Sequence, residues 1–104
     1  MVAAVATSPC MLTMLEFTAP WCPPCKAMKP ALDALAAEYR LTLTEIDVER
    51  DMVAAQRYEV RATPTIVILR DGAEVGRVVG ARPRAFLAGM LDRALAGDVA
   101  IAGP

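Results

Sequence analysis

The sequence of 104 residues contains no histidine. That absence excludes serine-type catalytic triads, metal and haem sites with histidine ligands, and any proton relay built on imidazole. Cysteine is scarce as well: the chain has three, an odd number that argues against the disulfide framework of a secreted protein. The functions that remain need neither imidazole nor several structural disulfides.

Long apolar runs and charge of one sign are also missing. The longest fully apolar run is Met1–Ala6, whereas a membrane-spanning helix needs about 20 mostly apolar residues. The net charge is −1 and the 11 basic residues are spread along the chain, so no basic patch indicates nucleic acid or a membrane as a partner. The N-terminal segment lacks lysine and arginine and is too short for a signal peptide, which predicts a cytoplasmic, reducing location.

Apolar residues are abundant, at 56% of the chain, which excludes intrinsic disorder. A chain of this length forms one packed core and not two. We therefore expect a single domain over residues 1–104, with its core at about 11–95.

The hydrophobic pattern predicts elements in the order β-α-β-α-β-β-α. Strands are expected at 11–17, 41–47, 65–69 and 74–79, and helices at 25–39, 51–58 and 84–95. The first two connections are helical and imply parallel pairing, whereas Asp71-Gly72 is a hairpin signal that implies an antiparallel pair. The prediction is an α/β fold with a mixed sheet of about four strands and helices on both faces. The tail at 97–104, rich in small residues, is expected to be loose.

The chemistry of the chain is concentrated in Trp21-Cys-Pro-Pro-Cys25, where the first strand gives way to the first helix. Two cysteines three residues apart at such a junction place both sulfurs on one turn, within disulfide reach. Cys22 falls at the N-cap, where the helix dipole and a free amide stabilise a thiolate. Since Pro23 and Pro24 have no N–H, the amide of Cys25 is the first donor that can reach the Cys22 sulfur. The more buried Cys25 is then the resolving cysteine, and Cys22 attacks a disulfide.

Other interpretations of the cysteine pair are a structural disulfide, a pair of inert thiols, a zinc site and a copper chaperone. A zinc site needs four ligands, which Cys10 cannot complete in a chain without histidine. A copper chaperone with this motif has a ferredoxin-like β-α-β-β-α-β order, which differs from the order expected here. The helix N-terminus and Trp21 favour a reactive, partly exposed site. Cys10 is interpreted as a bystander thiol.

A second motif, Ala62-Thr-Pro-Thr65, follows the first by about 40 residues and precedes a strand dense in β-branched residues. Together with Pro30, Asp47, Tyr58-Glu-Val-Arg61, Asp71-Gly72 and Gly80, these motifs resemble the thioredoxin family from about Met11 to Leu95. The resemblance implies a thioredoxin-like fold and a dithiol–disulfide oxidoreductase. It also implies a cis Pro64 packed against the cysteine pair.

The resemblance further implies a protein-disulfide reductase that works through a Cys22/Cys25 dithiol–disulfide cycle, in electron transport and cell redox homeostasis. Its substrate would dock in an extended form in a shallow apolar groove beside Trp21, Thr63 and Pro64. A flavin-dependent thioredoxin reductase would return electrons to the oxidised protein, and no metal or bound cofactor is implied.

Glu16 stands six residues before Cys22, at the place of the family's buried aspartate. The resemblance implies that it accepts the proton of Cys25; the alternative is that it is only the polar end of a strand. Two further departures are Pro-Pro between the cysteines, where general thioredoxins have Gly-Pro, and Glu45, where many bacterial members carry lysine. The dipeptide affects thiolate stability and hence the redox potential.

The segment before Met11 is too short to supply the strand and helix that the family normally has there, and Val2–Ala6 would form at most one turn of helix. The strand from Leu41 to Asp47 is therefore expected to lie at the sheet edge, where a second copy could pair with it to form a homodimer. Two functional alternatives stay open at this stage. One is a thioredoxin-fold binding or scaffold subunit, and the other is an extracytoplasmic thiol oxidase or dedicated reductase that lacks its leader.

Overall fold

The computed structural model describes residues 11–97 and 100–101. Cys10 and the turn expected at Val2–Ala6 lie outside the described residues. The elements are β1 (Leu12–Thr18), α2 (Pro23–Tyr39), β2 (Thr42–Asp47), α3 (Met52–Arg57), β3 (Thr65–Arg70), β4 (Ala73–Val79), α4 (Arg84–Leu95) and β5 (Ala100–Ile101). The expected order is confirmed as far as α4, and β5 is an addition to it.

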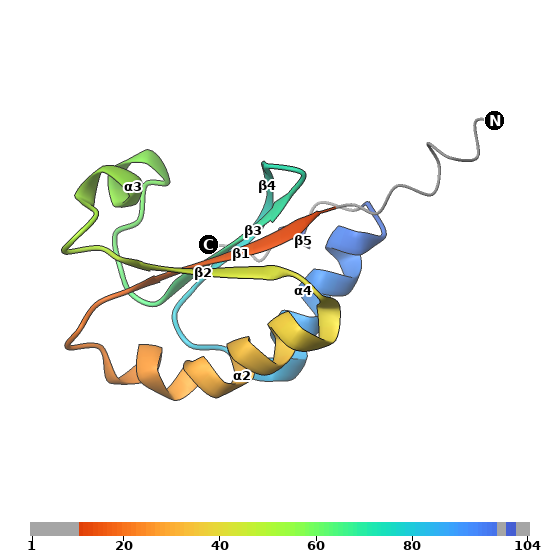
Figure 1. Cartoon of the computed structure of the whole chain (residues 1–104), viewed down its shortest axis with the longest axis horizontal. Coiled ribbons are helices and arrows are strands. Elements are labelled where there is room, and N and C mark those ends of the chain that lie inside the picture. The colour runs from red at the N-terminus through yellow and green to blue at the C-terminus, as the bar shows by residue number, and fades with distance from the viewer. Residues whose placement is uncertain (1–10, 98–99, 102–104) are drawn as a thin grey trace.

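The strands form one mixed sheet in the order β2-β1-β3-β4-β5 (Figure 1). The β1–β2 and β4–β5 pairs are parallel, whereas β1–β3 and β3–β4 are antiparallel. The fifth strand lies in the tail that the sequence predicts to be loose, and it pairs with Gly76 and Arg77 of β4. Two residues are too few to show the alternation that marks a strand in a sequence.

One expectation about strand direction is wrong. The sequence predicts parallel pairing across both helical connections, but β3 runs antiparallel to β1. The register shows why: Thr18 pairs with Asp47 at the end of β2, and Phe17 pairs with Thr65 at the start of β3. The chain therefore leaves β2 and enters β3 at the same end of the sheet. The short α3 does not carry the chain back along the sheet, so β3 has to run in the opposite direction.

Helices cover both faces of the sheet, as expected (Figure 1). The side chains of β1 alternate between the two faces. Leu12 and Met14 pack in a core with buried residues of α2 and α4. Leu15 and Phe17 pack on the opposite face, where Ala54 of α3 and Tyr58, the C-cap of that helix, lie against them. Glu16 follows the alternation of Leu12 and Met14, so it lies on the face that α2 covers.

The α2 helix begins at the cysteine motif because Pro23 and Pro24 suit its first two positions, where an N–H has no helical partner. It continues through Pro30 and is capped by Arg40, which adopts a left-handed conformation (φ 53°) and donates its N–H to the Ala36 carbonyl. Its buried residues, Cys25, Met28, Leu32 and Leu35, fix one face of the helix on the sheet. This packing holds the cysteine motif at the end of β1.

Within the described residues, β2 lies at one edge of the sheet, as the sequence predicts. Thr42, Thr44 and Glu45 of this strand are exposed. No helix in the described part of the chain is long and apolar enough to cross a membrane.

Candidate active site

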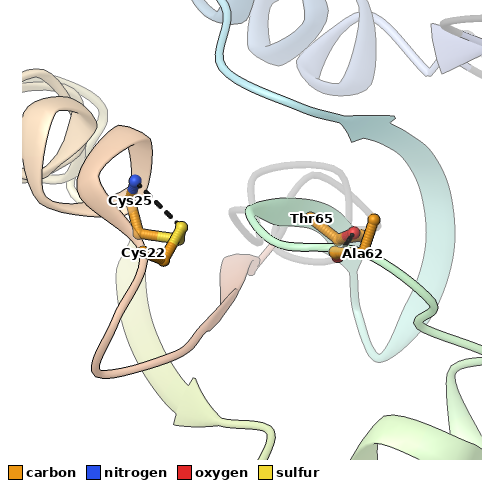
Figure 2. The surroundings of a disulfide bond; sticks show 4 residues. All are labelled: Cys22, Cys25, Ala62 and Thr65. Carbon is orange, nitrogen blue, oxygen red and sulfur yellow. Dashed lines mark hydrogen bonds between the residues drawn. A yellow bond between two sulfur atoms is a disulfide. The ribbon is translucent and has the colours of Figure 1, made fainter.

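Cys22 and Cys25 form a disulfide at the N-terminus of α2, with their Cα atoms 5.3 Å apart. Cys22 is the N-cap residue, and the Cys25 N–H donates a hydrogen bond to Cys22 Sγ over 3.3 Å (Figure 2). Both features are predicted from the sequence and both are confirmed. Because Pro23 and Pro24 carry no N–H, Cys25 supplies the first amide of the helix that can donate to the Cys22 sulfur.

The N-cap position distinguishes the Cys22 sulfur from that of Cys25. The positive end of the helix dipole and the Cys25 amide both favour negative charge on this sulfur once the disulfide is reduced. Exposure does not distinguish the two residues in the oxidised form, since Cys22 is 2% and Cys25 1% exposed. The expected partial exposure is therefore not found, because Ala19 and Val48 pack around the two cysteines.

The Thr63–Pro64 peptide bond is cis, as the family resemblance implies. Pro64 is buried, and the turn before β3 is closed by the Thr65 hydroxyl, which donates to the Ala62 carbonyl over 2.7 Å (Figure 2). Since β3 starts at the end of the sheet where β1 stops, this turn and the cysteine motif belong to the same end of the molecule.

A shallow cavity of about 190 Å³ lies at this end of the molecule. It is lined by Trp21, Val48, Val60, Arg61, Ala62 and Thr63. Val48 also packs against the cysteine pair, so the cavity and the disulfide share a wall. The structure thus brings Trp21 and Thr63 together, as expected for the groove, whereas the buried Pro64 is not in its lining.

Trp21 precedes Cys22 in the chain and is 66% exposed. Its indole Nε1 donates a hydrogen bond to Glu49 Oε2. Neither Glu49 nor Val48 carries a sequence signal that predicts a site residue. Both follow the end of β2, and no motif or spacing rule connects them to Trp21; only the parallel pairing of β1 and β2 brings these segments together.

Glu16 is fully buried on the face that α2 covers, and neither of its carboxylate oxygens has a hydrogen-bond partner among the described residues. Burial raises the pKa of Glu16 from 4.5 to about 7, and the negative charge of Glu45 contributes to the rise. Lys29 lowers this pKa and Asp33 raises it. Glu16 can therefore take up or release a proton near neutral pH, although no direct hydrogen bond joins it to either cysteine.

The arrangement suits thiol–disulfide exchange. One sulfur stands at a helix N-terminus, a second sulfur is bonded to it, and a cavity adjoins both. In the part of the chain that the structure describes, no group of three or more histidine, cysteine, aspartate or glutamate residues could hold a metal ion.

Comparison with known proteins gives concordant results. Residues 3–93 match the family model described as Thioredoxin. A thioredoxin of Staphylococcus aureus is 39% identical over 84 residues, which cover 79% of this chain and 81% of that protein.

Solved structures agree with this match. The thioredoxin of Fasciola hepatica is 34% identical with a TM-score of 0.75, and the match covers 88% of each chain. The oxidised mitochondrial thioredoxin 3 of Saccharomyces cerevisiae is 36% identical with a TM-score of 0.71, and the match covers 78% of this chain and 77% of that one. The residues matched to the family model include both cysteines and Pro64.

Proposed function

The chain belongs to the thioredoxin family and is a thiol–disulfide oxidoreductase with Cys22 and Cys25 as its redox pair, and from this premise we propose that it reduces disulfides of other proteins. The observation that carries the proposal is the N-cap position of Cys22, with the Cys25 N–H directed at its sulfur. Such a sulfur is activated as a nucleophile by the helix itself, in a chain that has no imidazole to activate it.

The reaction begins from the reduced pair. The Cys22 thiolate attacks one sulfur of a substrate disulfide, forms a mixed disulfide with it, and releases the other substrate sulfur as a thiolate. Cys25 then loses its proton and attacks the Cys22 sulfur. This step forms the Cys22–Cys25 disulfide and releases the second substrate sulfur. Two electrons pass from the protein to the substrate.

Glu16 is the proposed acceptor of the Cys25 proton. Three observations support this role: Glu16 lies on the sheet face that α2 covers, it is completely buried, and its pKa is about 7. With this pKa, the carboxylate and the acid are both populated near neutral pH. Because no direct hydrogen bond joins Glu16 to Cys25, the transfer requires a bridging water.

The proposed docking site is the cavity that Trp21 and Thr63 line. An extended substrate segment in this cavity would lie beside the cysteine pair, since Val48 contacts both. Glu49 holds the Trp21 ring by its indole N–H and so fixes one wall of the cavity.

The cycle also requires a partner that returns two electrons to the Cys22–Cys25 disulfide. We propose a thioredoxin reductase for this part, in a reducing cytoplasm, where such a disulfide persists only as a catalytic intermediate. The proposed partner of the β2 edge is a second copy of the chain, which would form a homodimer by extending the sheet.

Turnover with insulin as the disulfide substrate and dithiothreitol as the reductant tests the proposal. Cys22→Ser should lower the rate to the uncatalysed background. Cys10→Ser, which leaves the redox pair intact, is the matched control and should reduce insulin at the unmodified rate. Turnover that survives Cys22→Ser would contradict the proposal and favour a binding or scaffold role for the fold.

A further inference from the structure

Four charged side chains lie near one another on β1, β2 and α2, namely Glu16, Glu45, Lys29 and Asp33. Glu16 and Glu45 are register partners on the parallel strands β1 and β2, so their side chains leave the sheet on the same face. The α2 helix covers that face, and on it Lys29 Nζ contacts Asp33 Oδ1 at 3.0 Å. Two carboxylates therefore share one patch of the sheet, under a helix that carries a lysine.

The members of this cluster differ in their access to water. Glu16 is completely buried, Lys29 is half-buried and Glu45 is exposed. Since no hydrogen bond stabilises the Glu16 carboxylate in the described residues, its ionisation depends on burial and on nearby charges. Charges beside such a group act on it more strongly than on an exposed carboxylate, because the protein around Glu16 screens them less than water does.

We propose, on the premise that Glu16 accepts the Cys25 proton, that Glu45 and Lys29 are positioning residues that act through Glu16 in opposite directions. Glu45 opposes a second negative charge on its register partner and so holds the proton on Glu16. Lys29 attracts that charge from the helix above and so releases the proton. The two residues together set the pH range in which the mixed disulfide is resolved.

Among the described residues, the charges that shift the pKa of Glu16 come from β2 and α2. Glu45 on β2 raises the pKa of Glu16, Lys29 on α2 lowers it, and Asp33 on α2 raises it. Ile66, the register partner of Glu16 on β3, is uncharged. The cysteines of α2 do not titrate while they form the disulfide.

Glu45, the exposed carboxylate, lines a second cavity of about 300 Å³. Its lining residues are Thr18, Ala19, Pro20, Lys26, Glu45 and Asp47. Lys26 and Asp47, which carry opposite charges, line this cavity together with Glu45. The side chain of Glu45 can be changed from this open side without disturbing the packed core.

A substrate-independent experiment tests the charge coupling. The oxidised protein is labelled at the carboxyl carbon of glutamate, and the titration of Glu16 is followed by NMR. Glu45→Gln should lower the titration midpoint by roughly half a pH unit, and Lys29→Met should raise it by a similar amount. Glu74→Gln on β4, two strands away from β1, is the matched control and should leave the midpoint unchanged.

Single-turnover kinetics test the consequence for the reaction. The pH profile of mixed-disulfide resolution should move to lower pH in Glu45→Gln and to higher pH in Lys29→Met, while the initial attack by Cys22 keeps its rate. Midpoints that do not move, or that move in the same direction in both variants, would overturn the inference.

The premise is checked separately with Glu16→Gln. Slower resolution in this variant supports the proton role of Glu16. Resolution at the unmodified rate would overturn that role, and with it the inference about the reaction, even if the NMR midpoints shift. The insulin assay with Cys22→Ser tests the reductase activity independently of either result.

Discussion

Cys22 depends on the backbone around it for its reactivity. Its sulfur receives the Cys25 N–H because two prolines remove the intervening donors and because α2 begins at this point. All of these conditions follow from five consecutive residues, Trp21 to Cys25. This is why the N-cap position of Cys22 and the hydrogen bond to its sulfur could be predicted from the sequence without knowledge of the fold.

Glu16 shows where prediction from the sequence stops. The family resemblance selects it, but its charged neighbours Glu45, Lys29 and Asp33 come from another strand and from the helix above. The contact between Trp21 and Glu49 has the same origin, because the two residues follow different strands. Pairings of this kind depend on sheet register and could not be predicted from local spacing.

The buried Glu16 carboxyl predicts a pH-dependent stability. Its pKa is raised from 4.5 in the unfolded chain to about 7 in the folded protein, so the folded state binds the proton more tightly. The contribution of Glu16 to the free energy of unfolding is complete below pH 4.5 and is lost as the pH rises through about 7. The stability lost in this way is roughly 3 kcal/mol. Glutamine does not ionise, so the Glu16→Gln variant does not lose this stability at high pH. The free energy of unfolding of the oxidised protein should therefore exceed that of the unmodified protein at about pH 8.

Urea denaturation of the oxidised protein at several pH values measures this difference. The gain should shrink toward zero as the pH falls to about 4.5, where the neutral acid and the amide resemble each other. Glu74→Gln, which removes an exposed carboxylate, should show no such trend. A gain that is the same at all pH values would contradict the burial of an ionisable Glu16.

At the scale of helices and strands, most bounds agree with the sequence prediction because each element has a clear period or cap. The α4 helix spans Arg84–Leu95 as expected, and Asp51 caps α3 through its side chain, which accepts from the Ala54 N–H over 3.0 Å. The direction of β3 and the pairing of β5 were missed. Both depend on where the chain crosses the end of the sheet, which no single segment encodes.

The β2 strand carries the prediction about assembly. Its position at the sheet edge, within the described residues, offers unpaired backbone groups to a second copy of the chain. Sedimentation at tens of micromolar should therefore show a dimer in equilibrium with monomer. Thr44→Lys, at an exposed position of β2, adds a charge to this edge and should shift the equilibrium toward monomer.

Ala73→Lys on β4 is the control for that variant, because it adds the same charge at an exposed position on another strand. A monomeric mass at all concentrations would contradict the dimer. Slow amide exchange along 42–46 in that monomer would contradict the open edge too, since another segment would then have to cover it.

At the scale of the whole molecule, the topology explains why the site lies at one end of the sheet. The cysteine motif follows β1, Glu49 follows β2, and the Thr63–Pro64 turn precedes β3, which runs antiparallel to both. Three segments distant in sequence therefore converge at a single end of the sheet. The reversed direction of β3, the feature that the sequence did not predict, is the one that brings the cis-proline turn to the end of the sheet where the cysteine motif lies.

The central claim is that Cys22 attacks and Cys25 resolves. The most direct test is to mix reduced Cys25→Ser protein with insulin and to map the covalent adduct by peptide mass spectrometry. The account predicts an adduct joined through Cys22 that persists until dithiothreitol releases it, because the resolving thiol is absent. An adduct joined through Cys10, or rapid turnover without any trapped adduct, would contradict the assignment.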